Sequence, residues 1–319
     1  MNIGIVQVDG KLPNLALMKI AGYHEQKGDT VSWYDGALFA GQYDKVYASK
    51  IFDFSEMPEL PENKSTVGGT GIDHHNRLPS DMEAATPSYS LYKSHWRAFN
   101  HIGKLNKPCD YHLGFSMKGC RFSCAFCVVP AKEGKPYKYN SIDEILINPD
   151  GGNKLVLLDN DFFGTGDWEI NLKRIIELNL KVNFNQGLNI RILTQRQANL
   201  LATCKYYNLH FTKRYLTFAW DRYEDRADIM KGVERCDTAG IRRDHLQFFV
   251  LIGYDTTPEQ DLDRVETIRE LGAMPFVMPY NKFDQYQKEF ARWANSRQLK
   301  NVKWADYIHN FKTAKAKTA

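Results

Sequence analysis

Three cysteines, Cys120, Cys124 and Cys127, fall within the short segment GCRFSCAFCVVP. Their spacing is C-x3-C-x2-C. Three thiolates can bind three irons of a [4Fe–4S] cluster, which leaves the fourth iron without a protein ligand. A small molecule can then coordinate that iron. The pattern therefore predicts a catalytic cluster, in which the cofactor supplies the chemistry and the protein positions and tunes it.

Zinc binding and disulfide formation are the alternative interpretations of these cysteines. A zinc site usually has four ligands in two paired clusters, and no second C-x2-C follows here. The nearby His112 lies in the apolar segment YHLGFSM, which favours a buried, hydrogen-bonded histidine over a ligand. Disulfides fit an intracellular composition without a signal peptide poorly. The cluster interpretation ranks first, zinc second and disulfides third.

With Phe126 just before its last cysteine, the motif resembles the cluster loop of the radical S-adenosylmethionine (SAM) superfamily, C-x3-C-x-aromatic-C. The resemblance implies that the open iron binds the amino and carboxylate groups of the methionine part of SAM. One electron then cleaves SAM to methionine and a 5′-deoxyadenosyl radical, which abstracts hydrogen from a substrate. It also implies a reducing electron donor such as flavodoxin or ferredoxin. The substrate, a small molecule or a nucleic acid, stays unidentified.

Composition bounds the remaining possibilities. The chain has 319 residues, of which 43% are hydrophobic, so it can form one large domain or two modest ones. No apolar run approaches the roughly 20 residues that span a bilayer, so we expect a cytoplasmic protein without a membrane partner. The net charge of +4 is spread along the chain and permits a nucleic-acid partner without arguing for one. The remaining cysteines are predicted to be buried: Cys109, Cys204 and Cys236.

The amino-terminal region has the pattern of a parallel α/β domain. Residues 2–8 are predicted to form a strand, 12–28 a helix, and 30–34 and 45–52 further strands, which gives a Rossmann-like domain over 1–80. The opening P-x-L-A-L-x-x-I-A resembles the cobalamin-binding-like domain that precedes many radical SAM barrels. The usual lower-ligand motif D-x-H-x-x-G is missing at the first turn, where Asp9 and Gly10 stand without a histidine. Cobalamin therefore stays open as a cofactor but is not favoured.

Two further segments of this region are less regular. The Gly-rich segment 67–73 either admits a nucleotide tail or simply makes a turn. His74 and His75 are expected in a surface loop. Residues 81–109 are predicted to be a linker that includes one helix near 90–101.

From residue 110 strands and helices alternate. The predicted strands are 111–116, 154–158, 181–185, 214–219, 246–251 and 274–278, and the clearest helices are 168–179, 194–205, 225–238 and 258–271. Six such strands suit a partly closed parallel barrel. The superfamily core is a partial (β/α)6 barrel with its cluster loop after the first strand, so the resemblance covers roughly 110–283. Residues 284–319 are predicted to be a helical extension and a solvated tail.

Active sites of β/α barrels lie at the carboxyl ends of the strands. Residues in those positions are therefore candidates for binding SAM: Asp159, Asn160, Asp161, Gln186, Asn189, Arg191, Asp221 and Gly253. The resemblance implies that the segment 159–161 contacts the amino group of SAM, although these residues suit a helix N-cap equally well. Arg191 suits the SAM carboxylate, because a guanidinium can form a bidentate pair.

The remaining candidates follow the later strands. Asp221 is expected to bind the ribose or face the substrate, whereas Glu224 is expected at a solvated helix start. The resemblance implies that Gly253 lets the backbone approach the adenine and that the Phe126 backbone reads the adenine amino group. The end of the sixth strand, residues 278–281, is expected to line the substrate pocket.

The predicted function is reductive cleavage of SAM followed by hydrogen abstraction. Alternatives are a cobalamin-dependent methyltransferase, a modifier of tRNA or DNA, and, from another class, a nucleic-acid-binding protein with a structural cluster. The loop also resembles that of tRNA methylthiotransferases. Residues 1–108 contain no cysteine for the second cluster of those enzymes, and 284–311 has a helical pattern where they carry an RNA-binding barrel.

Overall fold

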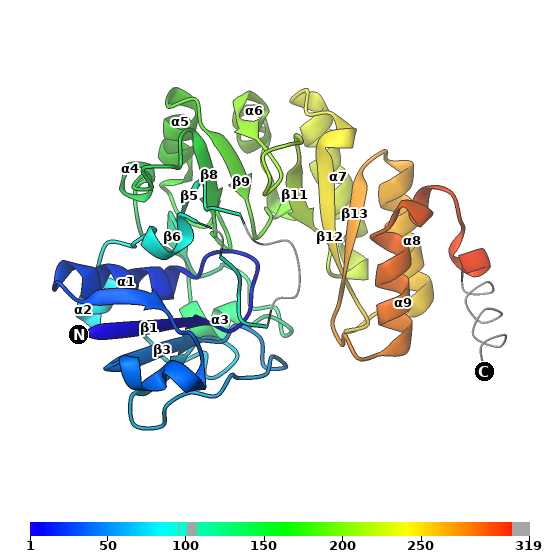
Figure 1. The fold of residues 1–319 in the computed structure, drawn as a ribbon. Helices are drawn as coiled ribbons and strands as arrows, with labels where there is room; N and C mark the ends of the chain where they lie inside the picture. The colour runs from blue at the N-terminus through cyan, green and yellow to red at the C-terminus, as the bar shows by residue number, and fades with distance from the viewer. Residues whose placement is uncertain (95, 101–106, 308–319) are drawn as a thin grey trace, which may run out of the picture. The chain divides into compact units, whose positions relative to one another are not determined.

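The computed structural model describes residues 1–94, 96–100 and 107–307, and these form two compact units (Figure 1). The first unit consists of Met1–Gly114, Cys127–Gly134 and Asp143–Lys154. The second consists of Phe115–Phe126, Lys135–Ile142 and the chain from Leu155 on. Both units are built from parallel strands and helices, so the α/β class predicted from the sequence is confirmed.

The first unit has a sheet of four parallel strands in the order β2-β1-β3-β4. The strands are β1 (Asn2–Gln7), β2 (Thr30–Trp33), β3 (Lys45–Ser49) and β4 (Ser65–Gly68). Helix α1 (Leu15–Gln26) begins where the Asn14 side chain accepts hydrogen bonds from the backbone N–H groups of Ala16 and Leu17. Its apolar face packs on β1 and β3 in a buried core of Ile3, Ile5, Leu17, Ile20, Tyr47 and Met82.

The other elements of the first unit are short. They are the 3-10 helices Ala37–Gln42 and Ser90–Tyr92, α2 (Ser80–Glu83), β5 (His112–Gly114) and α3 (Val129–Glu133). Helix α4 (Ile142–Ile145) also lies in this unit, except for its first residue. Strand β4 occupies the start of the predicted Gly-rich turn. The predicted helix near 90–101 is wrong in its described part. Only the short 3-10 helix Ser90–Tyr92 forms there, and Phe99 and Asn100 lie in a turn whose N–H groups donate to the carbonyls of Gln7 and Val8 at 2.6 and 2.8 Å.

The second unit contains two groups of parallel strands. β8 (Lys154–Leu157), β9 (Lys181–Phe184) and β10 (Lys205–Tyr206) lie in the order β10-β9-β8. β11 (Leu216–Ala219), β12 (Leu246–Ile252) and β13 (Met274–Pro279) form the sheet β11-β12-β13. A parallel bridge between Leu188 and Phe218 links the two groups. The predicted strands are therefore confirmed, whereas a partly closed barrel is not shown.

Helices of the second unit alternate with these strands as predicted. They are α5 (Trp168–Glu177), α6 (Gln195–Thr203), α7 (Arg226–Thr238), α8 (Pro258–Glu270) and α9 (Gln285–Ala294), with 3-10 helices at Ile190–Ile192, Tyr223–Asp225, Arg243–His245 and Arg297–Lys300. Thr194 and Thr257 begin α6 and α8 with capping boxes. Helices α8 and α9 lie beside β13 (Figure 1). The predicted tail beyond 307 lies outside the described residues.

One small element was not predicted. β6 (Met117–Lys118) and β7 (Tyr137–Lys138) form an antiparallel pair on either side of the cysteine segment. Two-residue strands are too short to produce a periodic pattern in the sequence. Within the described residues, no helix combines the length and the apolar character needed to cross a membrane.

Candidate functional site

The cysteine segment is an irregular loop between β6 and α3. Cys120, Cys124 and Cys127 are each half-buried, and none is in a disulfide. Gly119 precedes the first of them with φ +81°, a conformation that side chains other than glycine's rarely adopt. The other cysteines, Cys109, Cys204 and Cys236, are buried as predicted. Burial raises the pKa of each of these three thiols to about 12.

Two buried carboxylates after β8 hold the loop on both sides of Cys120. Asp159 accepts hydrogen bonds from the Ser116 N–H at 2.7 Å and from the Ser116 hydroxyl. Asp161 accepts from the Arg121 backbone N–H at 3.1 Å and from its guanidinium at 2.7 and 2.8 Å. The carboxylate raises the pKa of Arg121 above its ordinary value. In the described structure these carboxylates therefore bind the loop itself.

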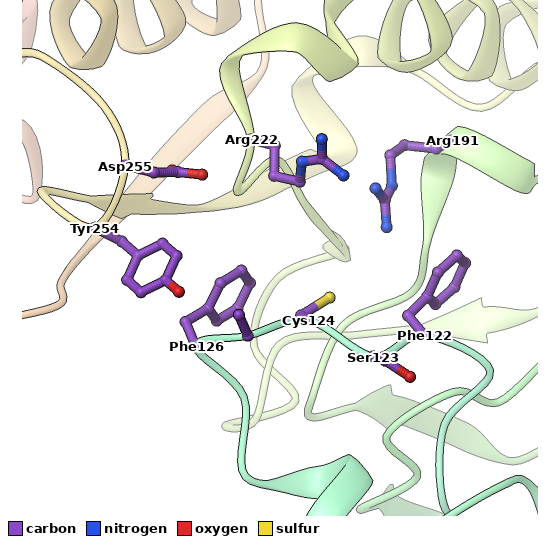
Figure 2. A pocket seen from close by; sticks show the side chains of 9 residues that line it. Phe122, Ser123, Cys124, Phe126, Arg191, Arg222, Tyr254 and Asp255 are labelled. Carbon is purple, nitrogen blue, oxygen red and sulfur yellow. The ribbon is translucent and has the colours of Figure 1, made fainter.

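A pocket of about 650 Å³ lies over this loop (Figure 2). It is lined by Phe122, Ser123, Cys124, Ala125, Phe126, Arg191, Arg222, Tyr254 and Asp255. The last four follow β9, β11 and β12 at their carboxyl ends, which is where the sequence predicted the active site. The Cys124 side chain points into the same space as the guanidinium groups of Arg191 and Arg222 (Figure 2).

Arg191 is held in place by its neighbours. Its guanidinium forms an ion pair with Asp225 at 2.8 Å and donates to the Asn189 side chain at 3.2 Å. It also lies over the Phe122 ring, 4.9 Å from the centroid. Asn189 caps the 3-10 helix Ile190–Ile192, because its side chain accepts from the Arg191 N–H. Arg191 thus lines the pocket, and Asn189 positions it.

Outside the cysteine loop, three residues that line the pocket were not predicted from the sequence: Arg222, Tyr254 and Asp255. Arg222 directly follows the predicted Asp221, and Tyr254 and Asp255 directly follow the predicted Gly253. Because neighbouring residues of an extended backbone project to different sides, a residue next to a predicted one can be the one that lines the pocket. Arg222 pairs with the exposed Glu224, with 2.7 Å between Nε and Oε1. The Tyr254 ring meets the Phe126 ring edge to face, 5.4 Å between centroids. Their position just after the ends of β11 and β12 could have identified these residues in the sequence.

The other predicted site residues do not line this pocket in the described structure. Asn160 is half-buried beside the two anchoring carboxylates, and Gln186 is exposed. Asp221 is half-buried, and its removal from water raises the pKa to about 6, opposed by the Leu251 N–H and the charge of Arg264.

Gly253 packs against α9. With φ +71°, its position leaves no room for a side chain, since a Cβ would lie 2.1 Å from Nε2 of Gln287. The close approach that this glycine allows is therefore to Gln287.

The histidines behave as the sequence predicted. His112 is buried, its Nδ1 accepts from the Asn148 N–H at 3.1 Å, and its Nε2 lies 3.2 Å from the Gly152 carbonyl. Burial lowers its pKa. His74 and His75 belong to a surface turn in which Asp73 accepts from the His75 N–H at 2.8 Å.

The cysteines fit an iron–sulfur cluster in chemistry and accessibility. Thiolates are its usual ligands, and all three cysteines belong to one loop and are only half-buried. In the described part of the chain, however, no three His, Cys, Asp or Glu side chains lie close enough together to hold a metal ion. Binding would therefore require the thiols to turn toward a common point.

Comparison with known proteins adds no assignment. No protein-family model matches the chain, and no curated protein matches it.

Proposed function

We propose that this chain is a radical SAM enzyme, in which Cys120, Cys124 and Cys127 bind a [4Fe–4S] cluster and the adjacent pocket binds SAM. The observation that carries the proposal is the pocket lining, which joins Cys124 and Phe126 of the motif to Arg191. Its volume of about 650 Å³ lies within the roughly 300–1,000 Å³ of typical small-molecule sites.

The side chains of the pocket suit the different parts of SAM. The Arg191 guanidinium, oriented by Asp225 and Asn189, would bind the carboxylate. The paired rings of Phe126 and Tyr254 offer an aromatic surface for the adenine. A bound cluster would supply the electron for reductive cleavage of SAM, delivered to it by a flavodoxin or ferredoxin. Hydrogen abstraction from an unidentified substrate would follow.

The finer fold assignment belongs to the same proposal. The parallel order β2-β1-β3-β4 supports a cobalamin-binding-like first unit. At its first turn Asp9 is buried and accepts from the Ile51 and Phe52 N–H groups, at 2.8 and 3.0 Å. We therefore propose the cobalamin-binding-like fold without cobalamin as a required cofactor. The alternation of strands and helices supports a radical SAM core in the second unit.

The test is SAM cleavage by protein reconstituted without oxygen. The protein is loaded with iron and sulfide, reduced with dithionite, given SAM and assayed for 5′-deoxyadenosine. Cys124→Ala removes one proposed ligand, and Cys204→Ala is the matched control because Cys204 is buried outside the loop. We expect 5′-deoxyadenosine from the native protein and the control, and none from Cys124→Ala.

Two outcomes contradict the proposal. If the native protein assembles a full four-iron cluster but neither binds nor cleaves SAM, the cluster is structural. If Cys124→Ala forms 5′-deoxyadenosine at the native rate, the loop does not carry the chemistry.

A further inference from the structure

The Gly-rich segment of the first unit packs against its own chain. Gly69 has φ +102°, and a Cβ there would lie 2.3 Å from the Lys50 carbonyl oxygen. A Cβ on Gly71 would lie 2.5 Å from the carbonyl carbon of Phe52. The Gly71 N–H donates to the Lys50 carbonyl at 3.0 Å. These two glycines therefore allow the segment to pack closely against the backbone that follows β3. That backbone fills the space beside them.

The same segment contacts the helix that follows the third cysteine. The Lys132 ammonium of α3 donates to the Thr70 hydroxyl at 3.0 Å. The Arg77 guanidinium donates to the Lys132 carbonyl, and also to the carbonyls of His74 and Asn76 at 2.7 and 3.0 Å. Both the side chain and the backbone of Lys132 are thus bound. Helix α3 begins at Val129, two residues after Cys127.

We propose that residues Gly69–Arg77, here named the glycine clamp, fix the position of the Cys127 thiol by holding α3. Thr70 and Arg77 are then positioning residues, which act through Lys132. The inference deepens the proposed function, because it rests on Cys127 as a ligand of the cluster. The first unit then contributes to the reaction by positioning one ligand of the cluster, without binding a cofactor itself.

The physical reason is the way a cluster depends on the placement of its ligands. Mutation of groups that orient metal ligands typically lowers metal affinity or activity by roughly 10–100-fold. Cys120 directly precedes Arg121, which Asp161 binds, whereas Cys127 belongs to a segment of the first unit. Loosening the clamp should therefore free one thiol of the three and leave Cys120 as it is.

The experiment measures the reactivity of each thiol in the full-length protein without a cluster. The reduced protein is treated with iodoacetamide for increasing times, and alkylation of Cys120, Cys124 and Cys127 is followed by peptide mass spectrometry. The variants are Thr70→Val, Arg77→Ala and the double variant. Arg97→Ala, at an exposed position of the same unit, is the matched control.

We expect the double variant to raise the alkylation rate of Cys127 relative to that of Cys120 by roughly two- to fivefold, as loss of partly exposed polar contacts would. The control should leave the ratio unchanged. After reconstitution, the electron paramagnetic resonance signal of the reduced double variant should shift or broaden. The clamp is refuted if the ratio stays at its native value, or if all three thiols react faster together.

The clamp and the proposed function fail differently. If the native protein forms no four-iron cluster while the ratio responds to the variants, the clamp holds and the proposed function fails. If the native protein cleaves SAM while the ratio does not respond, the proposed function stands and the clamp fails.

Discussion

At the scale of single residues, Arg191 is oriented by the protein itself. Asp225 and Asn189 fix the guanidinium, so little side-chain entropy is left to lose when an anion binds. Arg191→Lys keeps the charge but removes the planar pair of donors. We expect SAM to bind roughly tenfold more weakly, consistent with the loss of one charge-assisted hydrogen bond.

Equilibrium dialysis with labelled SAM measures this change on the reconstituted protein. Arg196→Lys, an exposed position on α6, is the control and should bind like the native protein. Native affinity in Arg191→Lys would show that the carboxylate is bound elsewhere.

Asp221 gives a second prediction at this scale. Burial raises its pKa to about 6, so between pH 4 and 6 the folded protein holds a proton that the unfolded chain releases. The contribution of Asp221 to the free energy of unfolding therefore falls as the pH rises through this range, and the full destabilisation by the buried charge is present above it. Asp221→Asn removes the charge, so we expect it to stabilise the protein by roughly 1–2 kcal/mol at pH 7.5 and by much less at pH 4.5.

Urea unfolding at the two pH values measures the difference. The exposed Asp255→Asn is the control. A stability gain of the same size at both pH values would rule out the titration of Asp221 as its cause.

At the scale of elements, the sequence predicted the long, periodic segments and missed the short ones. The apolar runs of β1, β12 and β13 and the capped helices α6 and α8 stand where their patterns indicated. Strands β6, β7 and β10, which were not predicted, have two residues each, and so short a strand carries no recognisable period. The turn at Phe99 and Asn100 follows from its backbone hydrogen bonds to the end of β1 and to Val8, a long-range contact that no local pattern contains.

The candidate site was predicted in the same uneven way. The strand ends and the cysteine spacing identified Cys124, Phe126 and Arg191, all of which line the pocket. The sequence pattern could not indicate that Asp161 forms an ion pair with Arg121, because this pair depends on how the cysteine loop folds back on the end of β8.

Gly253 allows a prediction about the junction of β12 and α9. In Gly253→Ala the new methyl group meets both a positive φ and the Gln287 side chain at 2.1 Å. Gly28 also has a positive φ, +81°, but a Cβ added there would have no atom within 4 Å, so Gly28→Ala isolates the backbone cost. We expect a loss of about 1 kcal/mol for Gly28→Ala and roughly 2–4 kcal/mol for Gly253→Ala.

Urea unfolding measures both losses, and Gln287→Ala in the Gly253→Ala background should recover the steric part. Equal losses of unfolding free energy at the two glycines would mean that the Gln287 side chain moves aside without a free-energy cost.

At the scale of the whole molecule, neither unit is a continuous stretch of chain. The first unit takes three segments, and the last of them ends at Lys154. A ribosome releases the chain from its amino end, so this unit cannot be complete until Lys154 has emerged. Cys120, Cys124 and Cys127 have all been synthesised by then. During translation the cysteine loop therefore emerges before either unit is complete.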